Sequence, residues 1–182
     1  EGVHYKLRTA NSYYPLKKNG EFNRIAEDNP IHSIFMGHKR GRFTGMIGLS
    51  GWSKLKRNAE KWESMQDIAV YNERALKIGA PHIWKRQRDF CDESVEEKYW
   101  LKGAPFTSIS ANKYSYVEGA GKMSAHIDGD DVDFGMTTMT VFRCGDYDGA
   151  YLSFPRYGVG IDADDGDILI ADSIELHGVT QI

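Results

Sequence analysis

Residues 124 to 131, Ser-Ala-His-Ile-Asp-Gly-Asp-Asp, place one imidazole and three carboxylates in eight consecutive positions. His126 and Asp128 are two residues apart, so their side chains share a face if the segment is a strand. A nitrogen and a carboxylate oxygen on one face can grip a single metal ion. The alternative is an acidic surface turn that carries a histidine. A third ligand from elsewhere would favour the metal site, because two side chains alone bind a transition metal weakly.

The candidate for the third ligand is His177, which follows the apolar stretch 168–170. Two histidines and one carboxylate with open coordination positions form the facial triad of non-haem Fe(II) oxygenases. The open positions are what oxygenase chemistry needs, since a co-substrate and O₂ must both reach the iron. We therefore predict that His126, Asp128 and His177 are metal ligands and catalytic residues. The other histidines are expected to be ordinary surface or core residues.

The first half of the chain must support this site, and its pattern is partly helical. Apolar residues recur at helical spacing over 53–79, with Ser53 as a candidate N-cap and Gly79-Ala80-Pro81 as a stop signal. A second helical stretch is expected over 95–101. Residues 1–52 are rich in Gly, Asn, Tyr and Pro, which predicts short strands and loops, including a loop over 37–42.

The second half of the chain is typical of strands and tight turns. Short runs of β-branched and aromatic residues, separated by Gly and Asp, cover 106–116, 122–127, 136–143, 150–154, 158–161, 167–171 and 176–182. Short strands at this spacing indicate a sandwich or barrel. We expect an α+β fold in one domain over 1–182, in which residues 1–104 form a helical and loop support for a β core over 105–182.

The bulk properties of the chain agree with a single globular domain. The chain has 182 residues, of which 41% are hydrophobic and 27% charged, values close to globular averages. The formal charge of −3 requires that any nucleic-acid contact come from a local basic face. Two distant cysteines indicate neither a zinc ribbon nor a disulfide framework. No apolar run approaches the length of a membrane span, so we expect an intracellular protein without a membrane partner.

Several motifs resemble the Fe(II)/2-oxoglutarate dioxygenases with a double-stranded β-helix core, a jelly-roll or cupin-like fold. They are the His126-x-Asp128 pair, the segment 145–149 between two strands, the Gly166-Asp167 turn and the distal His177. Within that superfamily the chain resembles the TET/JBP family, especially its compact fungal and phage-type members. Residues 106–112, 145–152 and 177–182 carry this likeness, and residues 45–52 resemble its N-terminal Gly-rich segment more loosely.

The resemblance implies Fe(II), 2-oxoglutarate and O₂ as cofactor and co-substrates. It also implies oxidation of the 5-methyl group of a pyrimidine in DNA, with 5-methylcytosine converted to 5-hydroxymethylcytosine as the expected reaction. The segment Asn112-Lys113-Tyr114 is similar to the Asn-x-Tyr pair of AlkB-like demethylases. By that likeness Asn112 and Tyr114 are the candidate 2-oxoglutarate ligands, because an amide and a phenol can both donate to its oxygens.

One feature departs from the superfamily pattern. The distal carboxylate of 2-oxoglutarate is normally held by an Arg or Lys on the last barrel strand, beyond the second histidine. The sequence ends at Ile182. Either a further C-terminal segment supplies that residue, or another basic side chain such as Arg143 does. We favour the further segment, because a barrel without its last strand would expose an open edge. We therefore expect that the core over 105–182 lacks this last strand.

Recognition of DNA would require a base contact and phosphate contacts. A methyl group inside a duplex is reached only when the nucleotide is flipped out. Asp131 is the candidate contact to an exocyclic amine such as cytosine N4, with Asp130 or Asp133 as alternatives. Basic residues that can neutralise phosphates occur at 38–42, 54–57 and 85–88, although solvated loops and helix faces explain them equally well.

Three alternatives to oxidation of 5-methylcytosine stay open on the sequence. The first is a thymine hydroxylase of the JBP type. The second is a dioxygenase that acts on a small molecule or a protein. The third is a non-catalytic jelly-roll binding module. The expected compartment is the cytoplasm of a bacterial host for a phage-encoded protein, or the nucleus for a eukaryotic one. The oligomeric state is not determined by the sequence.

Overall fold

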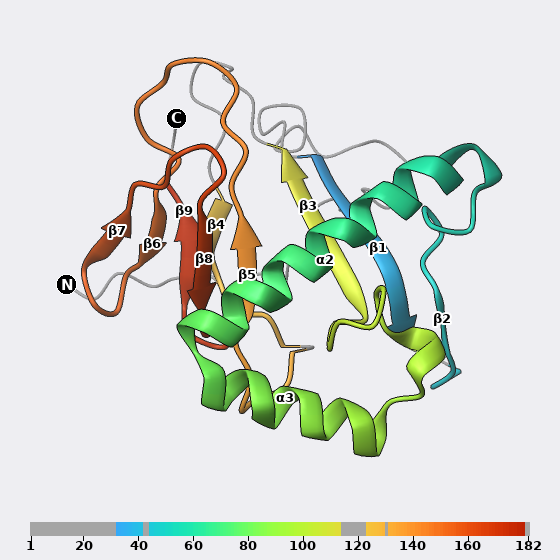
Figure 1. Cartoon of the computed structure of the whole chain (residues 1–182). Helices are drawn as coiled ribbons and strands as arrows, with labels where there is room; N and C mark the ends of the chain where they lie inside the picture. Colours follow the sequence, from blue (N-terminus) through green and yellow to red (C-terminus); the bar gives the residue numbers. More distant parts are fainter. Residues whose placement is uncertain (1–31, 42–43, 114–122, 130, 181–182) are drawn as a thin grey trace.

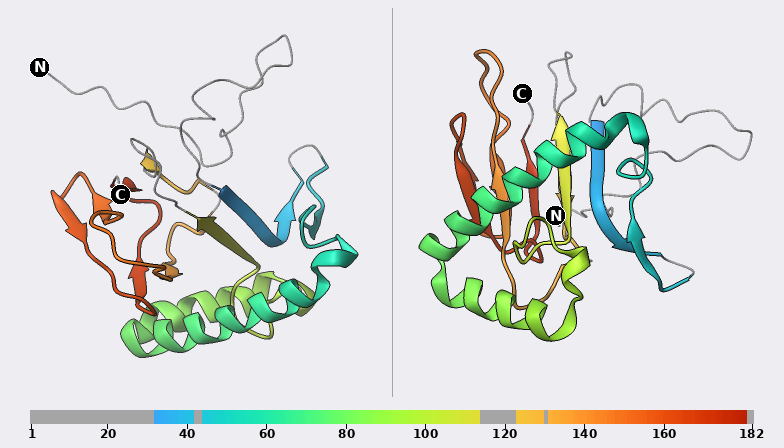
Figure 2. Two further views of the ribbon diagram at one scale, coloured as in Figure 1. Left: turned by 90° about the horizontal axis from the view of Figure 1, so that it is seen from above. Right: turned by 45° about the vertical axis from the view of Figure 1, so that its right-hand side comes forward.

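The computed structural model describes residues 32–41, 44–113, 123–129 and 131–180. Two helices lie on one side of all the labelled strands, and α2 crosses in front of β1, β3 and β5 (Figures 1 and 2). The structure confirms an α+β fold with antiparallel strands. The elements in chain order are β1 (His32–Arg40), β2 (Ile47–Leu49), the 3₁₀ turn η2 (Lys56–Asn58), α2 (Ala59–Gly79), α3 (Pro81–Ser94), the 3₁₀ turn η3 (Glu97–Tyr99), β3 (Ser108–Lys113), β4 (Met123–His126), β5 (Thr137–Thr140), β6 (Leu152–Phe154), β7 (Val159–Ile161), β8 (Ile168–Ala171) and β9 (His177–Val179).

The long helix α2 was predicted from its apolar spacing, whereas α3 was not. The prediction ended the helical region at Pro81 and placed the next helix over 95–101, but α3 begins at Pro81 and only η3 lies in the later segment. Proline is a common first residue of a helix, because its missing N–H is one that the first turn leaves unpaired and its φ is already helical. The same residue therefore ends one helix and starts the next.

Strand β1 corrects the expectation of a loop over 37–42, because it continues as far as Arg40. Its first part pairs with β3, from His32 to Gly37, and its last part pairs with β2. Gly37 marks the change of partner with a φ of +95°, and a Cβ there would lie 2.6 Å from the carbonyl oxygen of Thr107. Only glycine meets both conditions without strain.

The strands of the second half lie close to where the sequence predicted them. Strand β3 joins β1 and β2 in a three-stranded sheet, whereas the later strands form a four-stranded antiparallel sheet in the order β4-β9-β6-β7 and a separate pair, β5-β8. Strands distant in the chain are neighbours here, since β4 pairs with β9 and β9 with β6. The consequence for function is that the segments carrying His126 and His177 lie side by side.

The described core lies between α2 and β3. Ala69 of α2 packs with Leu101 and Ala104, and the partly buried Trp62, Phe106 and Ile109 surround them. Burial of such apolar surface contributes roughly 25 cal/mol per Å². Helix α2 therefore packs against the segment that leads into β3 and against β3 itself. Helix α2 also reaches β5, where Thr140 donates a 2.7 Å hydrogen bond to the Asn72 side chain.

Candidate metal centre

Three predicted ligands meet in the structure. One ligand atom from each of His126, Asp128 and His177 lies within 4.8 Å of the others, and among the described residues this is the group suited to a metal ion. His126 Nε2 is 3.6 Å from Asp128 Oδ1, and His177 Nε2 is 4.0 Å from Asp128 Oδ2. The two imidazole rings have centroids 4.5 Å apart. The arrangement leaves one nitrogen of each histidine directed at the same carboxylate.

A β-bulge aligns the two histidines. Strand β4 pairs with β9 through Met123 opposite Val179 and His126 opposite His177, so three steps along β4 match two steps along β9. A bulge inserts such an extra residue and re-aims the side chains next to it. His126 is 5% exposed. The bulge therefore places a buried imidazole directly opposite the second one.

Asp128 reaches the histidines from a loop, which corrects the expectation of one shared strand face. Strand β4 ends at His126, and Asp128 lies two residues beyond it. The N–H of Asp128 donates a 2.9 Å hydrogen bond to the carbonyl oxygen of Ser173. Ser173 lies between β8 and β9, the strand that starts with His177. A contact between two loops, rather than strand alternation, brings the carboxylate to the site.

The tautomer of His177 fits metal binding. Its Nδ1 is 2.8 Å from the carbonyl oxygen of Glu175, so an Nδ1–H donates to that oxygen and Nε2 is the ring nitrogen that faces Asp128. Ligating histidines commonly fix their second ring nitrogen in this way. Glu175 is itself held by Arg156, with Nη1 to Oε1 at 3.2 Å. Its hydrogen bond with Tyr157 raises the pKa of that phenol.

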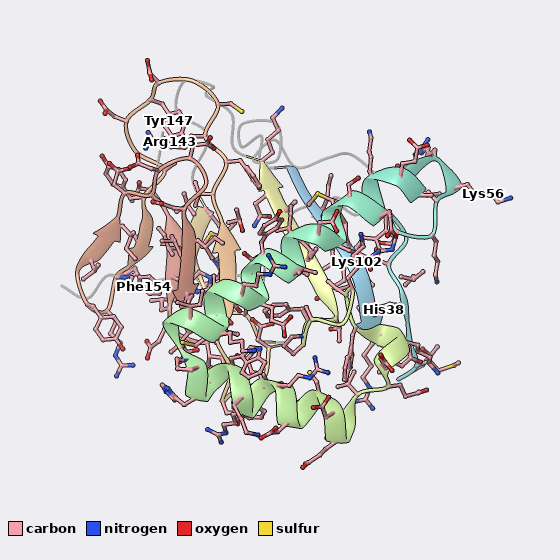
Figure 3. The ribbon with its side chains drawn as sticks, in the orientation of Figure 1. His38, Lys56, Lys102, Arg143, Tyr147 and Phe154 are labelled. Carbon is pink, nitrogen blue, oxygen red and sulfur yellow. The ribbon has the colours of Figure 1, made fainter. Side chains whose placement is uncertain are left out.

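Phe154 lines the centre next to His177. The two rings have centroids 6.3 Å apart, and Phe154 ends strand β6, the neighbour of β9. Figure 3 shows Phe154 at the opposite end of the strands from Arg143 and Tyr147. The sequence prediction did not include Phe154, because its proximity depends on the pairing of β6 with β9. It provides an apolar wall beside one imidazole.

Of the two predicted 2-oxoglutarate ligands, the structure describes Asn112 but not Tyr114. Asn112 is exposed near the end of β3. Ile109 of the same strand packs toward α2, and side chains alternate along a strand, so Asn112 lies on the face of β3 away from this helix. Tyr114 lies outside the described residues. A role for either in holding 2-oxoglutarate stays a prediction.

Asp131 has two hydroxyl partners. Its Oδ2 accepts hydrogen bonds from Thr137, at 2.8 Å, and from Ser173. Both hydroxyl residues were missed by sequence reasoning, because neither forms a motif and the contact joins two separate loops. Contact of Asp131 with a base stays a prediction, as does the alternative with Asp133. Asp130 lies outside the described residues.

Arg143 is poorly placed to hold 2-oxoglutarate. Its Nη1 is 3.3 Å from Asp162 Oδ1, and its Nη2 donates to the carbonyl oxygen of Tyr147 at 2.9 Å. Figure 3 places Arg143 at the opposite end of the strands from Phe154, which lies beside His177. The structure therefore argues against Arg143 as the anchor of the distal carboxylate.

His38 and Lys56, from two of the three basic groups, do not lie at the metal centre. Figure 3 places His38 and Lys56 on the far side of the molecule from Phe154. On α3, Arg88 binds Asp92 at 3.1 Å, and Arg86 stacks on Phe134, with its guanidinium carbon 4.6 Å from the ring centroid. Part of the 85–88 group therefore has a structural role. Phosphate contacts from these groups stay a prediction.

A pair of histidines and a carboxylate converging on an antiparallel sheet is the donor set of mononuclear non-haem iron oxygenases. Comparison with known proteins agrees with this class of enzyme. The chain is 26% identical over 125 residues to thymine dioxygenase JBP1 of Trypanosoma brucei brucei, a match that covers 69% of this chain and 14% of the relative. It is 25% identical over 121 residues to thymine dioxygenase JBP1 of Leishmania tarentolae, covering 66% of this chain and 13% of the relative. The chain thus spans only a small part of the length of these curated relatives.

No family model matches the chain, and no solved structure matches it significantly. The similarity to JBP1 agrees at the family level with the TET/JBP likeness that the motifs predicted. Neither helix of the described ranges combines the length and apolar character that a bilayer span requires.

Proposed function

We propose that the chain is an Fe(II)- and 2-oxoglutarate-dependent dioxygenase that oxidises the 5-methyl group of a pyrimidine in DNA, with thymine as the favoured base. The observation that carries this proposal is the convergence of His126, Asp128 and His177 within 4.8 Å. The relatives are thymine dioxygenases by name, which supports the reaction class and favours thymine over 5-methylcytosine.

The residues present suit Fe(II). His126, Asp128 and His177 would hold the ion through two imidazole nitrogens and one carboxylate, the donor set of non-haem Fe(II) oxygenases. When bound, the iron supplies the activation of O₂ that 2-oxoglutarate drives. The chain's own residues hold the ligand geometry: the Glu175 carbonyl fixes the His177 ring, and Phe154 lines it on one side. Asn112 and Tyr114 are our proposed contacts to 2-oxoglutarate.

A double-stranded β-helix is the fold that we propose for the β region within a single domain over 1–182. The order β4-β9-β6-β7 supports it, because strands from the beginning and end of the region interleave in one sheet. The pair β5-β8 similarly joins the third and sixth of the seven strands that the structure describes after α3. The ligands His126 and His177 then come from adjacent strands of the same sheet.

The choice between thymine and 5-methylcytosine depends on the base edge. Thymine presents an O4 acceptor, whereas cytosine presents an N4 amine donor. A carboxylate such as Asp131 accepts from N4 but repels O4. Its Oδ2 already accepts hydrogen bonds from Thr137 and Ser173, so the argument that Asp131 selects cytosine through N4 is weaker. Oxidation of 5-methylcytosine is the second candidate. In both cases the base must leave the stack, and DNA is the proposed partner.

Mass spectrometry of nucleosides tests the proposal. Duplexes containing either thymine alone or 5-methylcytosine are incubated with the protein, Fe(II), ascorbate and 2-oxoglutarate, with His126→Ala as the control. We expect 5-hydroxymethyluracil that is lost in the control. Formation of 5-hydroxymethylcytosine alone would instead select the second candidate. Succinate with unchanged DNA would contradict the DNA substrate and favour a small molecule or protein. If iron-loaded protein forms neither succinate nor a modified nucleoside, the result would contradict an enzymatic function and favour a binding module.

A further inference from the structure

Three side-chain oxygen atoms, from Asp131, Thr137 and Ser173, form a cluster next to the loop contact that holds Asp128. Asp131 Oδ2 accepts from the hydroxyls of Thr137 and Ser173, and the two hydroxyl oxygens are 2.9 Å apart. Each hydroxyl carries one proton, whereas an ionised carboxylate only accepts. Asp131 therefore lets both hydroxyls donate to a single oxygen. Hydrogen bonds to a charged acceptor are roughly twice as strong as neutral ones.

Ser173 connects this cluster to the metal ligands. Its side chain is bonded to Asp131, and its carbonyl oxygen accepts the N–H of Asp128 at 2.9 Å. It is 7% exposed and lies in the loop that leads to His177. Thr137 begins β5, whose partner β8 ends at Ala171. The cluster thus joins the loop that carries Asp128 to the segment that leads into His177.

The carboxylate of Asp128 needs such support because Asp128 is the member of the triad that no strand holds. His126 and His177 are paired across β4 and β9, whereas Asp128 stands on a loop with its side chain 37% exposed. A metal site requires each ligand within about 0.5 Å of its productive position. Without contacts that fix the loop, metal binding itself would have to order it.

We propose that Asp131, Thr137 and Ser173 are positioning residues that hold Asp128 at the distance from the two histidines that one metal ion requires. This inference rests on the metal site of the proposed function. It differs from that proposal because it assigns to Asp131 a role in the absence of DNA. Its Oδ1 remains compatible with a base contact.

Titration with Co(II), which reports its coordination through visible absorption, tests the inference without DNA or turnover. Thr137→Val removes the hydroxyl at nearly constant volume, and Thr137→Ser restores it. Thr140→Val is the matched control, since it removes a hydroxyl from the same strand that bonds to Asn72 rather than to the cluster. We expect Co(II) binding about tenfold or more weaker in Thr137→Val, near wild type in Thr137→Ser, and unchanged in Thr140→Val.

Asp131→Asn provides a second variant in case Thr137→Val disturbs folding, and circular dichroism checks each protein. The Asp131→Asn substitution keeps the shape of the side chain but removes its charge. We expect weaker Co(II) binding with altered absorption in this variant. Equal affinity in wild type, Thr137→Val and Asp131→Asn would overturn the positioning role while leaving the metal site intact. A wild-type protein that binds Co(II) no better than His126→Ala would overturn the metal site itself, and the inference with it.

Discussion

Gly178 controls how closely the two histidine-bearing strands approach. It lies in β9 directly after His177, and a Cβ at this position would lie 2.8 Å from the Met123 carbonyl oxygen and 3.1 Å from Ala125 backbone atoms of β4. Carbon contacts are favourable only near 3.5 Å or beyond, so Gly178→Ala must push β9 and β4 apart by about half an ångström. Both obstacles are backbone, which cannot rotate away.

The expected cost follows from these distances. Overpacking of this kind destabilises by about 1–3 kcal/mol, partly offset by the 0.4–1 kcal/mol that alanine gains by restricting the unfolded chain. The net loss should be about 1–2 kcal/mol, or a fall in Tm of roughly 2–8 °C for a chain of this size. The shift also separates His177 from His126, so Co(II) affinity should fall about tenfold.

Gly160→Ala in β7 is the matched control. Among the described residues, a Cβ there meets only the Tyr151 side chain, at 3.7 Å, which is an ordinary contact. Urea unfolding should therefore show this variant at least as stable as wild type, whereas Gly178→Ala unfolds at lower urea. Equal midpoints and equal Co(II) affinities for the two variants would refute the close approach of β4 and β9.

Three further predictions concern the surrounding structure. Gln87 binds the backbone N–H and carbonyl of Met136 at 3.2 and 3.4 Å, so Gln87→Leu should lower the free energy of unfolding by about 1–3 kcal/mol. The control is Gln66→Leu, because the Gln66 side chain makes a solvent-exposed hydrogen bond to Glu63; equal losses in the two variants would contradict the prediction. Ala150 has a φ of +56°, and Ala150→Gly should raise the free energy of unfolding by about 0.5–1 kcal/mol, whereas a lower value would argue against that strain. Burial lowers the pKa of His38 below its usual 6.5, so the unfolded chain binds more protons and stability is lost as pH falls below that value. His38→Asn should therefore lose less stability than wild type between pH 7 and pH 5, by urea unfolding at each pH; equal losses would count against the shift.

The strands after Pro105 were predictable because each is a short run of β-branched and aromatic residues bounded by Gly or Asp. The facial-triad chemistry likewise depends on residue types that the sequence displays, so His126, Asp128 and His177 could be grouped from their types and spacing alone. The pairing of β4 with β9 and the bulge at His126 were not predictable, because they depend on contacts between distant segments. Phe154 was not predicted for the same reason, because its position depends on the pairing of β6 with β9.

The errors arose where one local signal has two meanings. Pro81 stops α2 and also starts α3, so a breaker was mistaken for the end of the helical region. Gly37 is typical of a loop, although its positive φ lets β1 exchange one partner for another. Asp131 stands out by its charge and its place after Asp128, but its hydroxyl partners come from segments that no sequence spacing connects.

Incubation under oxygen-18 gas tests the central claim most directly. Thymine-containing duplex, Fe(II) and 2-oxoglutarate are supplied with the wild-type protein or with His177→Ala, and the nucleosides are analysed by mass spectrometry. The account predicts 5-hydroxymethyluracil whose new hydroxyl carries the heavy isotope, formed by the wild type and not by the variant. Product that carries only ordinary oxygen from water, or equal product from His177→Ala, would contradict oxidation at this centre.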